Sequence, residues 1–171
     1  MATLPTLPEW VELEHKVALI LQEQEERGWT FDERAAWELA SSLEEELRQI
    51  SDVLQQRHPF VAGPEFTPAR PNKTRGYVAG ATFTRLIETN PTSRDHIAWI
   101  LQTKHGWKPT VKTATGKVQI DETVLAKLKN ETATMFSRCL TIRKTLGMIS
   151  HGVNAWLKLC TNNKIYHHCS V

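Results

Sequence analysis

The residues best suited to chemistry form a basic, hydroxyl-bearing run, Lys112-Thr113-Ala114-Thr115-Gly116-Lys117. Ammonium and hydroxyl groups, together with free backbone N–H groups, are what proteins use to hold phosphate oxygens. Gly116 allows the positive φ of a tight turn and lets another backbone approach closely. The run therefore predicts a phosphate-binding tip.

Two further groups extend this prediction. Ser93 and Arg94 stand at an expected helix start, where unpaired N–H groups and the helix dipole favour an anion, and a second basic pair stands one helix further on. Such groups position a nucleic-acid duplex without reading its base sequence. The candidate phosphate-binding residues are Ser93, Arg94, Lys112, Thr113, Thr115, Gly116, Lys117, Arg143 and Lys144.

No catalytic or metal centre is indicated. The sequence contains no G-x-x-x-x-G-K-[ST], G-x-G-x-x-G, H-E-x-x-H or C-x-x-C motif. The nearest approach to a metal cluster is Cys160 with His167-His168-Cys169, but neighbouring residues of a strand point to opposite faces and rarely bind one ion. Packing or solvent exposure is favoured over zinc there. For Trp99 and Trp107, core packing is favoured over stacking on bases.

The charge is divided unevenly along the chain of 171 residues. Residues 1–58 carry 5 Lys or Arg against 13 Asp or Glu, whereas residues 59–171 carry 16 against 6. This division suggests that the second part faces a polyanion, although an acidic helical pair beside an ordinary basic domain would also explain it. No apolar run is long enough for a membrane span, and the first nine residues do not resemble a secretory signal. We therefore expect a cytoplasmic protein with three reduced cysteines.

The elements that must position these residues are mostly helices. Apolar residues at spacings of three and four predict a helix over 10–27 and a second helix of about 25 residues that begins after the N-cap Asp32. A short extended connector, Trp29-Thr30-Phe31, joins them, which suggests a long antiparallel helical hairpin over residues 1–58. Residues 59–92 are rich in Pro, Gly and basic residues and are expected to form a loop.

The remainder is expected to be helical with small β elements. Ser93 caps a third helix that ends at Gly106, and Asp121 caps a short helix that ends near Leu128. A further helix is expected over 132–150. The predicted β elements are a hairpin near 110–120, a turn at 162–164 and a strand over 165–171. The fold class is therefore mainly α, with a basic helical segment over 93–160 and a strand beginning within 161–171.

Four stretches, taken in order, resemble the thumb region of family A, DNA polymerase I-like enzymes, and most closely the replicative polymerases of short-tailed phages. The first is Glu25 to Ala36, similar to the segment that follows the exonuclease domain. The second, Asn90 to Ile97, is similar to the N-x-x-S helix start. The third, Trp107 to Gly116 with Asp121 to Leu128, resembles the thumb tip. The last comprises Ile142 to Lys144, Trp156-Leu157 and Lys164 to His167, and it is similar to the long thumb helix and the first palm strand.

The resemblance implies a helical arm that grips the backbone of primer–template duplex DNA through the candidate residues listed above. It also implies that full-length members transfer nucleotidyl groups with Mg²⁺ held by palm aspartates. Those aspartates are expected beyond Val171, and the exonuclease carboxylates before Met1, so we expect no catalysis and no cofactor in this chain alone. The remaining polymerase domains could be a separate chain, as in a split enzyme.

Relatives that recruit thioredoxin do so through a long insertion between thumb helices. Residues 59–92 occupy that place but are shorter, which argues against thioredoxin binding. An alternative to the DNA-gripping segment is a helical protein-interaction module, which explains the acidic first part better.

Overall fold

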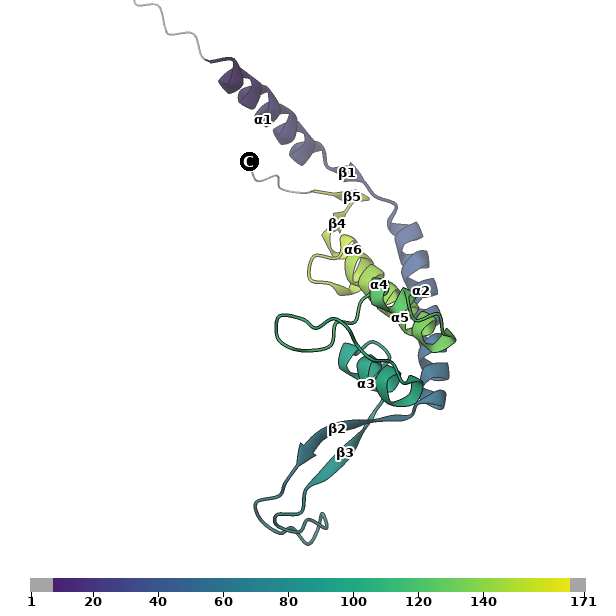
Figure 1. The fold of residues 1–171 in the computed structure, drawn as a ribbon. Coiled ribbons are helices and arrows are strands. Elements are labelled where there is room, and N and C mark those ends of the chain that lie inside the picture. Colours follow the sequence, from purple (N-terminus) through teal and green to yellow (C-terminus); the bar gives the residue numbers. More distant parts are fainter. Residues whose placement is uncertain (1–7, 167–171) are drawn as a thin grey trace, which may run out of the picture. The chain divides into compact units, whose positions relative to one another are not determined.

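The computed structural model describes residues 8–166 of the chain and divides it into two compact units. One unit comprises the chain up to Ser41 together with Leu146 onward, and the other comprises Ser42–Thr145. The predicted mainly α fold with small β elements is confirmed (Figure 1). In chain order the elements are α1 (Glu9–Arg27), β1 (Trp29–Thr30), α2 (Glu33–Arg57), β2 (Phe60–Phe66), β3 (Phe83–Glu88), α3 (Arg94–His105), α4 (Glu122–Ala126), α5 (Glu131–Leu146), the π-helical turn η1 (Gly147–His151), α6 (Trp156–Leu159), β4 (Cys160–Thr161) and β5 (Lys164–Ile165).

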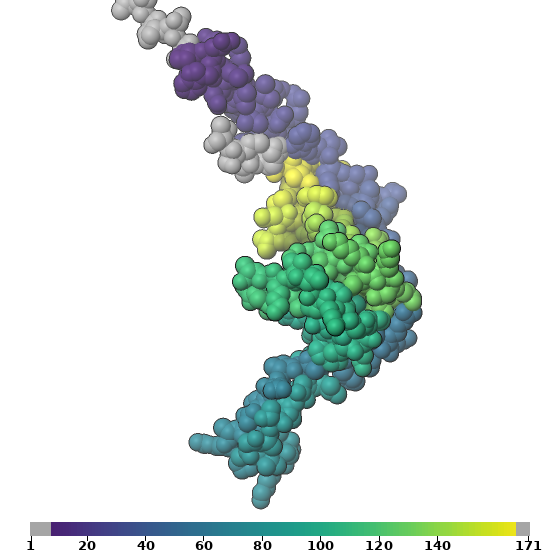
Figure 2. Space-filling model, viewed as in Figure 1, coloured from purple at the N-terminus to yellow at the C-terminus, as the bar shows by residue number. Residues whose placement is uncertain are grey.

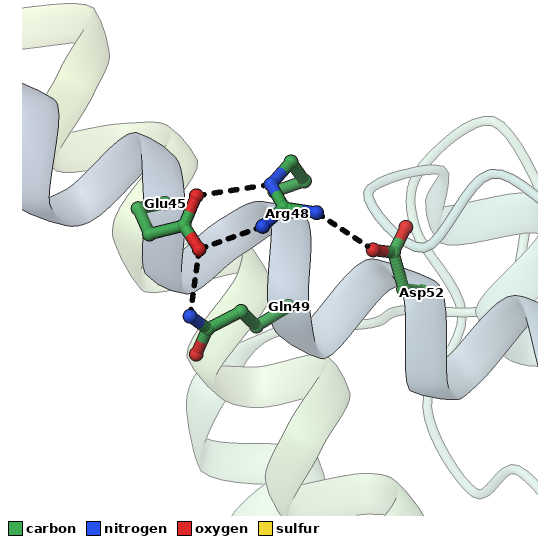
Figure 3. Close-up of polar contacts among 4 residues, drawn as sticks. All are labelled: Glu45, Arg48, Gln49 and Asp52. Atoms are coloured by element: carbon green, nitrogen blue, oxygen red, sulfur yellow. Dashed lines mark hydrogen bonds and ion pairs between the residues drawn. The ribbon is translucent and has the colours of Figure 1, made fainter.

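Helix α2 begins where the sequence predicts. The Asp32 carboxylate accepts a hydrogen bond of 2.9 Å from the backbone N–H of Ala35, which satisfies one of the unpaired donors of the first turn. Further along the helix, polar side chains form a network on its surface (Figure 3). Arg48 donates to both carboxylate oxygens of Glu45 and to Asp52, and Gln49 donates to Glu45. The Arg48 guanidinium, followed by the Gln49 amide, lowers the pKa of Glu45.

Both helices of the predicted hairpin are present, but they do not pack on each other as expected. No residue of α1 is buried, and the apolar stripe of α1 that should face α2 is exposed, including Trp10, Leu13 and Ile20. The connector Trp29–Thr30 is extended, as expected, and it pairs with β5, a contact that the sequence did not predict.

The first unit contains a small antiparallel sheet in the order β1-β5-β4. Strands β4 and β5 are joined by Asn162 and Asn163, whose φ values of 54° and 57° are those of a tight hairpin turn. This confirms the predicted turn. Strand β5 covers only the start of the expected strand over 165–171, and the rest of that strand lies outside the described residues, as does His167-His168-Cys169.

The second unit is held together by one hydrophobic core built from α2, β2, α3, α4 and α5. Ile97, Ile100 and Leu101 of α3 are fully buried, as are Phe136 and Ile142 of α5. A bidentate ion pair joins two of these helices at the surface, because Arg138 donates to the two carboxylate oxygens of Glu46 at 2.6 and 2.7 Å. This core fixes the starts of α3, α4 and α5 with respect to one another.

Residues 59–92, expected to be a loop, contain an antiparallel hairpin instead. Strand β2 pairs with β3 from Phe60 opposite Glu88 to Phe66 opposite Phe83, with a bulge between Ala62 and Glu65. The proline and glycine residues that argued against strands lie mostly in the connecting loop, and Pro64 lies at the bulge, where a missing N–H is tolerated.

Candidate phosphate-binding site

The start of α3 is shaped by Asn90. The Asn90 side-chain oxygen accepts from the backbone N–H of Thr92 at 3.0 Å and from its hydroxyl at 2.9 Å, while the Asn90 carbonyl accepts from the N–H of Ser93 at 3.0 Å. Ser93 is the N-cap residue, as predicted, but its side chain makes no capping hydrogen bond. Its hydroxyl and the first-turn N–H groups of α3 therefore remain able to bind an anion.

Arg143, from α5, reaches this turn. Its Nη1 donates to the carbonyl of Thr92 at 3.1 Å and to the Thr92 hydroxyl at 2.9 Å. The guanidinium thus ties α5 to the residue before the N-cap of α3. The remaining N–H groups of Arg143 are not used in these two bonds.

The predicted tip at 112–117 is a compact turn. The backbone N–H of Thr113 donates to the carbonyl of Lys117 at 2.7 Å, and the N–H of Gly116 donates to the carbonyl of Thr113 at 2.8 Å. Gly116 has a φ of 79°, as the sequence predicted. The expected hairpin near 110–120 is reduced to one isolated β-bridge between Lys112 and Val118. Without a second pair of strand residues, the two arms form no strands.

The tip is joined to α3 by an ion pair. Lys117 Nζ lies 2.7 Å from a carboxylate oxygen of Asp95, and both side chains are about two-thirds exposed. An exposed pair of this kind adds little stability, but it holds the Lys117 ammonium beside the first turn of α3. It also neutralises part of the charge that Lys117 could offer to a phosphate.

Asp121 connects the tip to α4. Its carboxylate accepts from the Thr123 hydroxyl at 2.6 Å, from the Gln119 amide at 2.5 Å and from the backbone N–H of Val124 at 2.8 Å. These three donors, in that order of effect, lower the pKa of Asp121 to about 2. The predicted cap of α4 is confirmed, and its carboxylate is negatively charged at neutral pH.

These elements enclose two neighbouring hollows of about 980 and 530 Å³, both lined by Ser93, Arg94 and Asp121. The larger hollow also takes in Arg143 and Lys144 from α5. The smaller one is completed by Lys117 with the hydroxyl-bearing residues Thr113 and Thr115 of the tip. Seven of the nine predicted residues are thus brought to these hollows. Lys112 and Gly116 line neither of them.

The basic residues of the site differ in how free they are. Lys117 is paired with Asp95, and Arg143 is bonded to Thr92. Arg94, Lys112 and Lys144 are exposed, and their side chains have no hydrogen-bond or ion-pair partner within residues 8–166. Arg94 and Lys144 line the hollows and Lys112 lies on the adjoining tip, so a phosphate could bind these three cations without breaking an existing contact.

Sequence reasoning missed the acidic and polar partners of the site. Asp95 pairs with Lys117, Thr92 accepts from Arg143, and Gln119 donates to Asp121. Thr92 and Arg143 are far apart in the sequence, so no local sequence pattern could indicate their contact. The only local signal was the acidic Asp95 directly after Arg94. A carboxylate in the first turn of a helix is common for its favourable effect on the helix dipole.

Within the described residues, no three His, Cys, Asp or Glu side chains lie together so as to hold a metal ion. Over the same residues, no helix is both long and apolar enough to cross a membrane.

A scan against protein-family models finds no match for this chain. Comparison with characterised proteins does find relatives. Over 93% of its length the chain is 28% identical to the DNA-directed DNA polymerase of Escherichia phage T7 and equally to that of Enterobacteria phage T3. It spans 29% of the length of each of these relatives. The chain is therefore similar to one segment of phage DNA-directed DNA polymerases.

Proposed function

We propose that this chain is the DNA-holding thumb segment of a family A replicative polymerase and that it grips the backbone of primer–template duplex. In this proposal, the remaining domains of the polymerase carry out nucleotidyl transfer and hold its Mg²⁺, whether those domains belong to the same polypeptide or to a separate one. The host-cell cytoplasm is the expected place of action. The similarity to the phage polymerases supports the general assignment.

One observation carries the more specific role. Three segments far apart in the sequence, around Ser93, Thr113 and Arg143, converge on two adjoining hollows within one hydrophobic unit. They bring together a helix N-terminus, hydroxyl groups and cations, which are the groups that hold phosphates without reading bases. Acidic residues line the same hollows, with Asp121 in both, Glu122 in the larger and Asp95 in the smaller, so binding would depend on the cations that remain unpaired.

The test is binding of primer–template duplex to the full chain over a range of NaCl concentrations. We expect the triple substitution Arg94→Gln, Lys112→Gln, Lys144→Gln to weaken binding and to reduce the slope of log K against log[salt] by roughly 2 to 3, because each phosphate contact contributes about 0.9 to that slope. Lys117→Gln should have a smaller effect, since its charge is already paired with Asp95.

The control is Lys16→Gln on α1, which removes a charge in the acidic part of the chain. Two duplexes of unrelated sequence should bind equally. An unchanged salt slope in the triple variant, or equal affinity for duplex and for dextran sulfate, would contradict a shaped DNA-binding site.

A protein-interaction module remains the second candidate, because one observation favours it. The apolar stripe of α1, with Trp10, Leu13 and Ile20 exposed, is covered by nothing within the described residues. If this candidate is correct, replacing Leu13 and Ile20 with Gln abolishes co-purification with the other polymerase domains, while the DNA-site triple substitution leaves co-purification and DNA binding unchanged. Loss of DNA binding in the triple variant favours the thumb segment.

A further inference from the structure

The hairpin of β2 and β3 ends in a loop, residues 67–82, that is ordered by its own backbone hydrogen bonds. Asn72 and Tyr77 exchange two bonds of 2.9 Å, and the N–H of Gly80 donates to the carbonyl of Pro68 at 2.9 Å. The hydroxyls of Thr67 and Thr82 lie 2.7 Å apart across the base of the loop. In the ribbon the loop closes the two strands, and in the space-filling view it is a knob with protruding side chains (Figures 1 and 2).

An aromatic cluster braces this loop from the strand side. The rings of Phe66, Tyr77 and Phe83 lie with their centroids 5.2 to 5.6 Å apart. Ring pairs at this distance are stabilising beyond the area that they bury. The cluster therefore gives the end of an otherwise thin hairpin a small hydrophobic centre of its own.

Arg85 covers the cluster. Its guanidinium carbon lies 4.8 Å from the centroid of the Phe66 ring, and its Nη2 donates to the Tyr77 hydroxyl at 3.1 Å. Arg85 therefore covers one face of the Phe66 ring, while the three rings pack against one another in tilted or edge-on contacts.

The charge of this end of the hairpin is entirely positive. Residues 66–87 contain Arg70, Lys73, Arg75 and Arg85 and no Asp or Glu. Arg70, Lys73 and Arg75 are exposed, and their side chains make no hydrogen bond or ion pair with the rest of residues 8–166. By contrast, Arg27, Arg34 and Arg48 on the helices are each paired with a carboxylate. Lys73 and Arg75 are also held close together, because both lie in the turn that the Asn72–Tyr77 bridge closes.

We propose that the end of the β2–β3 hairpin is a second DNA-binding surface, at which Arg70, Lys73 and Arg75 contact the phosphates of a duplex. This goes beyond the proposed function, which places DNA at the start of α3, at the last turn of α5 and at the 112–117 tip. Charge complementarity identifies the partner as a polyanion, and the exposed guanidinium and ammonium groups are those that contact its phosphate backbone. The hairpin holds three unpaired cations on a braced support, which limits the entropy lost on binding.

The test is the triple substitution Arg70→Gln, Lys73→Gln, Arg75→Gln in the full chain, with duplex binding measured across NaCl concentrations. We expect the slope of log K against log[salt] to fall by roughly 2 to 3, in proportion to the three lost contacts. The matched control Arg70→Lys, Lys73→Arg, Arg75→Lys keeps every charge and should keep the slope. An unchanged slope in the Gln variant overturns the proposal. If the variant keeps the slope but loses binding to a protein partner, the hairpin is a protein-binding surface and the proposal is equally overturned.

A second measurement needs no substitution. Bound duplex should protect Lys73 from acetylation, as read by mass spectrometry, whereas Lys16 on the acidic α1 should react equally with and without DNA. Equal reactivity of Lys73 in both states overturns the proposal. The two proposed DNA surfaces can be tested separately. If the Arg94, Lys112, Lys144 substitutions leave DNA binding unchanged but the hairpin substitutions weaken it, the proposed function is wrong and the hairpin surface stands. If only the hairpin substitutions leave DNA binding unchanged, the hairpin proposal alone is wrong.

Discussion

Among single residues, Asp121 has the most strongly held charge of the candidate site. Its carboxylate caps α4 and accepts three hydrogen bonds, which lower its pKa to about 2. Because the pKa is lower in the folded chain than in the unfolded chain, this carboxylate stabilises the fold at every pH well above 4. That stabilisation is lost as the pH falls through 4 toward 2.

We therefore expect Asp121→Ala to lower the free energy of unfolding at pH 7 by about 1 kcal/mol, the usual value of a lost N-cap. Urea unfolding measures this, and the difference from the wild type should shrink between pH 4 and pH 2. Asp121→Asn, which can still accept the bond from Val124, should lose less. A difference that does not change with pH would show that the charge is not held as described.

Contacts of single residues also show which basic side chains of the site already have a partner, a difference that could not be predicted from the sequence. Lys117 and Arg143 are engaged with Asp95 and Thr92, whereas Arg94 and Lys144 are not engaged. A lysine or arginine contributes less to phosphate binding when it must first break an existing ion pair or hydrogen bond. The unpaired cations are therefore the ones whose loss should matter most.

Among the elements, the end of α5 departs from α-helical geometry. The helix continues as a π-helical turn, Gly147–His151, closed by a 3.0 Å bond from the N–H of Gly152 to the carbonyl of Gly147. A Cβ on Gly152 would lie 2.3 Å from that carbonyl oxygen, which is too close for two nonbonded atoms. Because the oxygen belongs to the backbone, the turn itself would have to shift to relieve the contact. The π turn therefore requires glycine at position 152.

We expect Gly152→Ala to lower the free energy of unfolding by about 1–3 kcal/mol, as for other overpacked positions. The matched control is Gly147→Ala, where an added Cβ meets nothing within 4 Å and should stabilise the helix by up to about 1 kcal/mol. Thermal unfolding of both variants, followed by circular dichroism, compares them. Equal effects of the two substitutions would contradict the described turn.

Across the whole molecule, buried apolar contacts are unevenly distributed. The core of the second unit contains fully buried residues of α3 and α5, such as Ile100 and Phe136, whereas α1 has none. Local opening is least costly where few apolar contacts must be broken. In hydrogen exchange followed by mass spectrometry, amides of α1 should exchange fastest among the helices and those of α5 slowest. Protection of α1 equal to that of α5 would indicate a partner on its apolar stripe, such as a second copy of the chain.

The sequence by itself determined the local structure. Helix positions followed from apolar spacing, and their ends followed from Asp32, Asp121 and Gly106 together with the turn at 162–163. These signals lie within a few residues of the structure that they specify, because caps and turns depend on neighbouring backbone groups. The residue types of the candidate site were predictable for the same reason.

Only the tertiary structure decided which segments meet. The pairing of β2 with β3 joins residues on both sides of a long Pro- and Gly-rich loop, and β1 pairs with β5 from a distant part of the chain. The expected packing of α1 on α2 is not observed, since no residue of α1 is buried. The contacts of Arg143 with Thr92 and of Lys117 with Asp95 also cross long stretches of chain. Pairings of this kind depend on the free energy of the whole fold, so they cannot be predicted from a short stretch of sequence.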